Sequence, residues 1–170
     1  MVMTMTYQST RIVAFGLLTA CLAANIAQVS ATPRKITYAI IVNRNNPLDQ
    51  ISFPELRKIF LGERSHWPNG RRITLVLSEE ESAVRDATFR LLSGMGESDF
   101  IRYLLQTEFR GEGSGFKELN SATGVRKFVF NVPGAIGYVP LDEADESVKI
   151  LKIELKLPGD EGYRLQAILK

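Results

Sequence analysis

The sequence predicts an α/β domain with a largely parallel, mixed sheet. Short apolar runs rich in β-branched residues are typical of buried strands, and amphipathic segments that start with capping residues are typical of helices. The two kinds of segment alternate along most of the chain, as they do when helices connect parallel strands. The composition, 45% apolar and 24% charged, is that of an ordinary globular chain.

Three strands are predicted from apolar runs. Residues 36–42 read ITYAIIV, residues 73–77 read ITLVL and residues 135–140 read AIGYVP. Each run is short and bounded by turn residues, which is typical of a strand buried in a sheet. Residues 148–155 and 163–169 are expected to form terminal strands.

Helices are predicted between these strands. The first begins after Ser52, which forms a capping box with Glu55, and it ends at Gly62. Further helices are expected from Ser78 to about Leu92, over residues 99–109 and from Ser121. In the helix over 99–109, the side chains expected to face inward are Phe100, Ile101, Leu104 and Leu105. Trp67 is expected to plug the core beneath a turn, and His66 to lie on the surface.

The first 31 residues have the three parts of a secretory signal. A polar start with one positive charge at Arg11 precedes the apolar run 12–27, and small residues precede a cleavage point after Ala31. A lipoprotein signal over residues 1–20, with Cys21 lipidated, is an open alternative. An uncleaved anchor or a buried helix is another.

Residues 32–170 are expected to form one domain, whose composition excludes several function classes. The whole chain has 21 basic and 19 acidic residues, so no basic surface for nucleic acid is predicted. Cleavage after Ala31 would remove the only cysteine, and His66 is the only histidine, so neither a metal site nor a cofactor is expected. No hydrolase motif occurs, and the protein is predicted not to be an enzyme.

Four segments, taken together and in this order, form a motif set: 51–62 (ISFPELRKIFLG), 67–73 (WPNGRRI), 109–113 (FRGEG) and 132–139 (VPGAIGYV). Together they resemble the periplasmic phosphate-binding proteins of ABC transporters, over residue 36 to about residue 163. The resemblance implies a periplasmic-binding-protein-like (type II) sandwich of reduced size, as in a short single-domain subgroup of that family. It also implies a non-enzymatic, solute-binding function.

The sequence departs from the full receptors in two ways. It is about half as long as a two-lobed receptor. Full receptors also place an arginine and then a Gly/Ser/Thr-rich segment after the second strand, where they cradle the oxyanion. Here that stretch, 78–85, reads SEEESAVR and carries three carboxylates. The resemblance therefore implies the fold and leaves the ligand open.

Helix starts and nearby polar side chains predict an anion site. Unpaired amides and the helix dipole attract anions, and in a parallel sheet the helix starts follow the strand ends at one edge. The candidate ligand-binding residues are Asn43, Asn45, Ser52, Ser78, Ser82, Arg85 and Ser114. Each has a structural alternative, because serines cap helices, asparagines bond their own loop, Arg85 has Glu81 at i,i+4 spacing and residues 111–115 suit a flexible turn.

Two functions follow from these observations. The first is an exported solute-binding-like protein for phosphate or a related small oxyanion, which serves an inner-membrane ABC transporter or a sensing system in the periplasm. The second is a fold that has lost its ligand pocket and acts as an interaction module for another envelope protein. The acidic residues 79–81 and the shortened chain favour the second.

Overall fold

The computed structural model describes residues 34–79, 82–111 and 115–169. The chain divides into two units, Met1–Ala31 and Thr32–Lys170, and the description concerns the second. The predicted signal, with its alternatives at Ala31 and Cys21, lies outside the described residues, as do Glu81 and Ser114. No helix in the described ranges combines the length and the apolar character needed to cross a bilayer.

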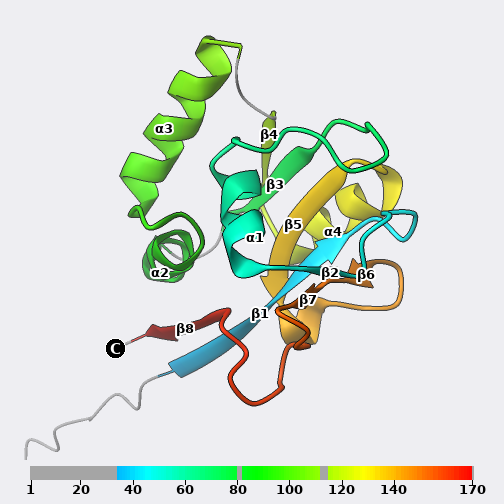
Figure 1. The fold of residues 1–170 in the computed structure, drawn as a ribbon. Helices are drawn as coiled ribbons and strands as arrows, with labels where there is room; N and C mark the ends of the chain where they lie inside the picture. The colour runs from blue at the N-terminus through cyan, green and yellow to red at the C-terminus, as the bar shows by residue number, and fades with distance from the viewer. Residues whose placement is uncertain (1–33, 80–81, 112–114, 170) are drawn as a thin grey trace, which may run out of the picture. The chain divides into compact units, whose positions relative to one another are not determined.

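A six-stranded mixed sheet forms the centre of the domain, in the order β4-β3-β5-β1-β6, with β8 also paired to β1 (Figure 1). The strands are β1 (Arg34–Val42), β3 (Thr74–Ser78), β4 (Phe116–Leu119), β5 (Ala135–Pro140), β6 (Lys149–Ile150) and β8 (Gln166–Leu169). A second sheet pairs β2 (Gln50–Ile51) with β7 (Lys152–Ile153).

The strands of the main sheet run in two directions. β3 is parallel to β4 and to β5, whereas β1 is antiparallel to β5, β6 and β8. The predicted α/β class and mixed sheet are confirmed. β4 was not among the predicted strands, because none of its residues is buried and its sequence FKEL carries little apolar signal.

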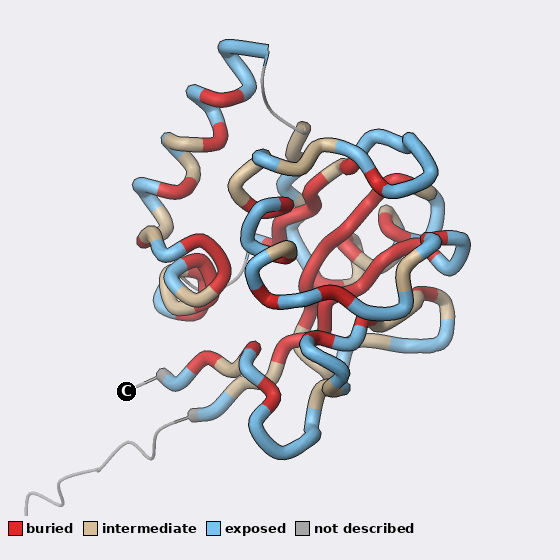
Figure 2. Tube along the Cα trace, in the orientation of Figure 1, coloured by how far each residue is buried: buried red, intermediate tan, exposed pale blue. Residues whose placement is uncertain are grey.

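Helices cover both faces of the sheet. They are α1 (Phe53–Phe60), α2 (Ser82–Ser93), α3 (Glu97–Phe109) and α4 (Ala122–Asn131), with a 3₁₀ turn at Leu141–Glu143. Leu75 and Leu77 of β3 belong to the larger core cluster with α1 and α2, whereas Val76 belongs to the smaller cluster with α4. This alternation is that of a strand buried on both faces, as the red strands in Figure 2 show.

The predicted start of α1 is confirmed in part. The Ser52 hydroxyl accepts from the amide of Glu55 at 3.3 Å, and Gly62 after the helix has a φ of 73°. The Glu55 carboxylate does not complete the capping box. It instead contacts Lys58 and Arg64, at 2.7 and 3.0 Å. Its pKa is lowered, first by the hydrogen bond from Lys58.

Trp67 plugs the core, as predicted. Its side chain is 2% exposed, and its indole Nε1 donates to the carbonyl of Gly134 at 3.0 Å. The indole thus ties the turn before β3 to the turn before β5. His66 beside it is exposed, also as predicted.

Two local predictions are wrong. Leu105 was expected to face inward from α3 but is 55% exposed, because α3 is buried on the side that carries Phe100 and Leu104. The two predicted terminal strands are also shorter than expected. The first is divided at Leu151 into β6 and β7, and it ends where Glu154 and Leu155 take positive φ values of 52° and 70°, which turn the chain.

Candidate functional site

The parallel strands end together at what we call the carboxyl edge. Ser78, the last residue of β3, pairs with Leu119, the last residue of β4, and β5 runs alongside in the same direction. Helix α2 begins at Ser82 and α4 at Ala122, each a few residues beyond its strand. The described fold therefore brings two helix starts to one edge of the sheet, where ligands bind in many α/β proteins.

Ser78 carries an unused polar group at this edge. The residue is 0% exposed, and its hydroxyl has no hydrogen-bond partner among the described residues. Since side chains alternate along a strand, Ser78 faces the same side of the sheet as Val76, the side that α4 covers. A buried hydroxyl without a partner costs about 1–3 kcal/mol, which marks it as a group that calls for an explanation.

The side chain of Ser121 caps the start of α4. The Ser121 hydroxyl accepts from the amide of Gly124 at 3.1 Å. One cap bond satisfies one of the four amides that a helix start leaves free, so the others remain available to water or a ligand. Ser121 therefore caps the helix that was predicted to begin there.

Arg85 of α2 is held by two carboxylates of its own chain. It is 7% exposed, its Nη2 donates to Glu118 at 2.7 Å, and its Nε lies 2.9 Å from Glu97 as an ion pair without hydrogen-bond geometry. Its guanidinium also lies over the Phe89 ring, 5.4 Å from the centroid. Burial by itself would lower the pKa of Arg85, but the hydrogen bond that Arg85 donates to Glu118 and the charges of both glutamates outweigh burial and raise it.

Arg85 and Ser78 lie on opposite faces of the sheet. Glu118, the partner of Arg85, pairs with Leu77 of β3, which faces α2. Ser78 is the next residue and points to the face of α4. The two predicted site residues share the carboxyl edge but do not converge from one side.

The predicted asparagines lie at the opposite edge. Since β1 is antiparallel to β5, Val42 pairs with Ile136 near the start of β5, and Asn43 leaves the sheet there. The Asn43 amide donates to the carbonyls of Val129 and Phe130 at 3.0 and 2.6 Å. The expectation that the asparagines share a crevice with the end of β3 is not met, because it assumed a parallel β1.

In the loop after Asn43 the asparagine side chains bond the backbone of their own loop, which is the structural role given above as the alternative to ligand binding. The Asn43 side-chain oxygen accepts from the amide of Asn45, which is itself exposed, at 3.0 Å. Asn46 is buried, and its oxygen accepts from the amide of Leu48, while its Nδ2 has no partner among the residues that the structure describes. Lys149 binds the carbonyl of Asn46 at 2.8 Å. These bonds fix the loop and do not form an open cluster of donors.

The remaining predicted serines are spread over the domain. Ser52 caps α1 and is exposed. Ser82 begins α2, but its side chain lies outside the described part of the chain, as does Ser114 altogether.

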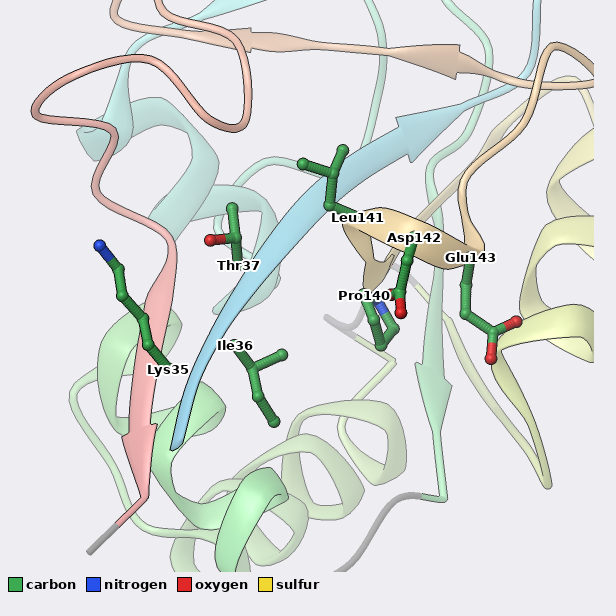
Figure 3. A pocket seen from close by; sticks show the side chains of 7 residues that line it. All are labelled: Lys35, Ile36, Thr37, Pro140, Leu141, Asp142 and Glu143. Carbon is green, nitrogen blue, oxygen red and sulfur yellow. The ribbon is translucent and has the colours of Figure 1, made fainter. Parts of the chain in front are cut away.

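A pocket of about 470 Å³ opens at the carboxyl edge, beyond the end of β5 (Figure 3). Its lining comes from the first residues of β1 and the turn after β5: Lys35, Ile36, Thr37, Pro140, Leu141, Asp142 and Glu143. Two carboxylates and one ammonium surround this pocket, so a bare anion gains little there. Sequence reasoning missed it, since its two halves lie about 100 residues apart.

No family model matches the chain, but individual proteins do. It is 30% identical over 121 residues to the phosphate-binding protein PstS of Bacillus subtilis (strain 168), an alignment that covers 68% of this chain and 35% of that protein. The fold is similar to that of an ABC-type phosphate transport receptor from Vibrio cholerae, with a TM-score of 0.61 and 20% identity over 79% of this chain and 55% of the receptor. It is also similar to PstS from Borrelia burgdorferi, with a TM-score of 0.58 and 17% identity over 80% and 57% of the two chains.

The chain spans about a third of the curated relative and just over half of these two solved structures. At 17–20% identity the structural likeness establishes the fold alone. Together with the sequence match, it confirms the resemblance drawn from the motifs at 51–73 and 132–139. The chain is thus similar in sequence to part of a phosphate-binding protein, and it has the periplasmic-binding-protein-like fold of phosphate transport receptors.

Proposed function

We propose that this protein binds a small oxyanion, phosphate first among them, at the carboxyl edge of the β4-β3-β5 sheet. The observation that carries the proposal is the Ser78 hydroxyl at the end of β3, which is fully buried and has no partner in the part of the chain that the structure describes. The relationship to phosphate-binding receptors and the two helix starts at the same edge support it.

Binding of this kind needs no chemistry beyond hydrogen bonding. Free amides at the start of α4 donate to the anion, the helix dipole favours its charge, and the Ser78 hydroxyl adds a donor from the strand side. A small shift of the α4 start is required for the anion to reach Ser78, because this hydroxyl is buried. The protein therefore acts as a binding protein and not as an enzyme.

The cellular role that fits this binding is solute capture outside the inner membrane. The signal-like first 31 residues support export to the periplasm by a cleaved signal, with lipid anchoring at Cys21 as the alternative. One similar solved structure is that of an ABC-type phosphate transport receptor, which supports an ABC-type transporter as the partner.

Calorimetric titration of the full chain with inorganic phosphate tests the proposal. We expect saturable binding in the micromolar range, and we expect Ser78→Ala to weaken it about tenfold, since one hydrogen bond to a charged ligand contributes about 1.5 kcal/mol or more. Ser93→Ala is the matched control, because Ser93 is also buried but its hydroxyl donates to the Phe89 carbonyl at 2.7 Å. It should lower stability and leave phosphate affinity unchanged.

Two results would count against the proposal. A folded chain that gives no heat with phosphate, sulfate or simple carboxylates would favour the interaction module. Phosphate binding that survives Ser78→Ala unchanged would show that the anion does not bind at the end of β3.

A further inference from the structure

The first half of β1 has a strand neighbour on one side only. The pairing of β1 with β5 ends at Tyr38 opposite Pro140, where the chain turns out of the sheet at Leu141–Glu143. Among the described strands, β8 alone pairs with residues 34–37. The pocket of Figure 3 lies between the start of β1 and the turn after β5, where a longer β5 would have continued.

Backbone hydrogen bonds show on which side of β1 the strand β8 lies. The Ile40 carbonyl accepts from the amide of Leu151, next to β6, at 2.9 Å. The Tyr38 amide donates to the carbonyl of Leu165, just before β8, also at 2.9 Å. Residues two apart in a strand direct their backbone groups to the same side, so β8 lies on the side of β6, across β1 from β5. The β5 side of residues 34–37 therefore carries no strand in the part of the chain that the structure describes.

Lys35 and Thr37 direct their backbone groups to this open side, because they alternate with the residues that face β8. A row of amides and carbonyls at a sheet edge is what another extended chain pairs with, and those hydrogen bonds give such strand addition its affinity. The adjoining pocket of about 470 Å³ gives room for a side chain of the added strand. Ile36 and Leu141, both partly buried, supply apolar surface to its lining.

The charges around the pocket favour a cationic side chain. Asp142 and Glu143 are exposed, and neither forms an ion pair with a described residue. In Figure 3 the ammonium of Lys35 points away from these two carboxylates. The nearby Arg126 donates to the backbone carbonyl of Glu143 and pairs with the carboxylate of Asp145 at 3.0 Å. Two carboxylates therefore remain without a cation at the pocket, and they complement a lysine or arginine of a partner.

We propose that an extended basic segment of a partner protein adds to the open side of β1 as a strand, with a lysine or arginine side chain in the pocket. Only the backbone groups of Lys35 and Thr37 face this side, so the strand gains about four hydrogen bonds. So short a contact is weak, with a dissociation constant on the order of 1 mM for an isolated peptide. The proposal does not depend on anion binding at Ser78.

Nuclear magnetic resonance of the ¹⁵N-labelled full chain tests the proposal. In the free chain the amides of Lys35 and Thr37 should exchange with solvent at least ~10-fold faster than those of Ile36 and Tyr38, which face β8. A capped peptide of alternating threonine and lysine should shift the Lys35 and Thr37 amide resonances in a saturable way. A peptide of alternating threonine and glutamate should bind at least ~10-fold more weakly.

Two variants test the backbone and the charges separately. Lys35→Pro removes an amide on the open side, where the strand tolerates proline, and should weaken binding at least ~10-fold, although the lost positive charge by itself favours a cationic peptide. Asp142→Asn with Glu143→Gln should weaken binding about fivefold. Glu63→Gln with Glu161→Gln is the matched control, because these carboxylates are exposed and lie outside the pocket lining, and it should leave binding unchanged.

Three results would overturn the proposal. Slow exchange of the Lys35 and Thr37 amides in the free chain would show that a segment outside the described residues already covers this side of β1. Equal binding of the two peptides would show that the carboxylates do not select the partner. An absence of binding up to about 10 mM, or binding that both variants leave unchanged, would show that β1 does not accept an added strand.

Discussion

Asn43 and Ser78 are both buried polar residues at the ends of central strands, yet the two edges they occupy differ. At one edge the Asn43 amide donates to two carbonyls in the last turn of α4, and its side-chain oxygen accepts from the backbone amide of Asn45 in the following loop. At the carboxyl edge the Ser78 hydroxyl has no partner within residues 34–79, 82–111 and 115–169. A polar side chain whose bonds are all made internally supports the fold, and one that is buried without a partner is available for something else. The comparison separates structural residues from binding candidates that look alike in the sequence.

The largest effect is expected for Asn43→Ala. The change removes three hydrogen bonds and leaves the buried carbonyl of Val129 unpaired, so we expect the free energy of unfolding to fall by about 3 kcal/mol. Urea unfolding followed by circular dichroism measures it. Phosphate affinity of the folded fraction should not change. A loss below about 0.5 kcal/mol would mean that the bonds of Asn43 do not hold this edge together.

A smaller loss is expected for Arg85→Met, which leaves Glu97 and Glu118 without their cation. Because both carboxylates are partly exposed, we expect a loss of about 2 kcal/mol rather than the 3–5 kcal/mol typical of fully buried pairs. Adding Glu97→Gln and Glu118→Gln should recover most of the loss in the same urea experiment. If the triple variant is no more stable than Arg85→Met, packing of the arginine and not its charge holds α2, α3 and β4 together.

The smallest effect on stability is expected for Ser78→Ala. Removing a hydroxyl that makes no bond should leave the free energy of unfolding unchanged or raise it by up to about 1 kcal/mol, while phosphate affinity falls. Thermal unfolding with and without phosphate measures both quantities in one experiment. A clear loss of stability without phosphate would show that this hydroxyl supports the fold, and the contrast with Asn43 would disappear.

Much of the fold could be predicted because its signals are local. Apolar runs gave β1, β3 and β5, and caps at Ser52 and Ser121 gave the starts of α1 and α4. Strand direction could not be predicted, because the apolar pattern of β1 is the same whether it runs parallel or antiparallel to β5. The exposed Leu105 was missed for a similar reason, since a helical period shows that a face is apolar but not what covers it.

The candidate site was predictable in its parts and not in its arrangement. Ser78 and the helix starts at the carboxyl edge follow from strand and cap signals. The partners of Arg85 do not, since Glu97 and Glu118 lie 12 and 33 residues further along the chain. An arginine in a sequence shows a charge, and only the packing of α3 and β4 shows that the charge is already neutralised.

The pairing of the first described strand with the last has a consequence for biosynthesis. β1 joins β8 from Arg34 opposite Leu169 to Thr37 opposite Gln166, so partners about 130 residues apart must meet before the sheet is complete. The nascent chain therefore has no finished core until its C-terminal residues leave the ribosome.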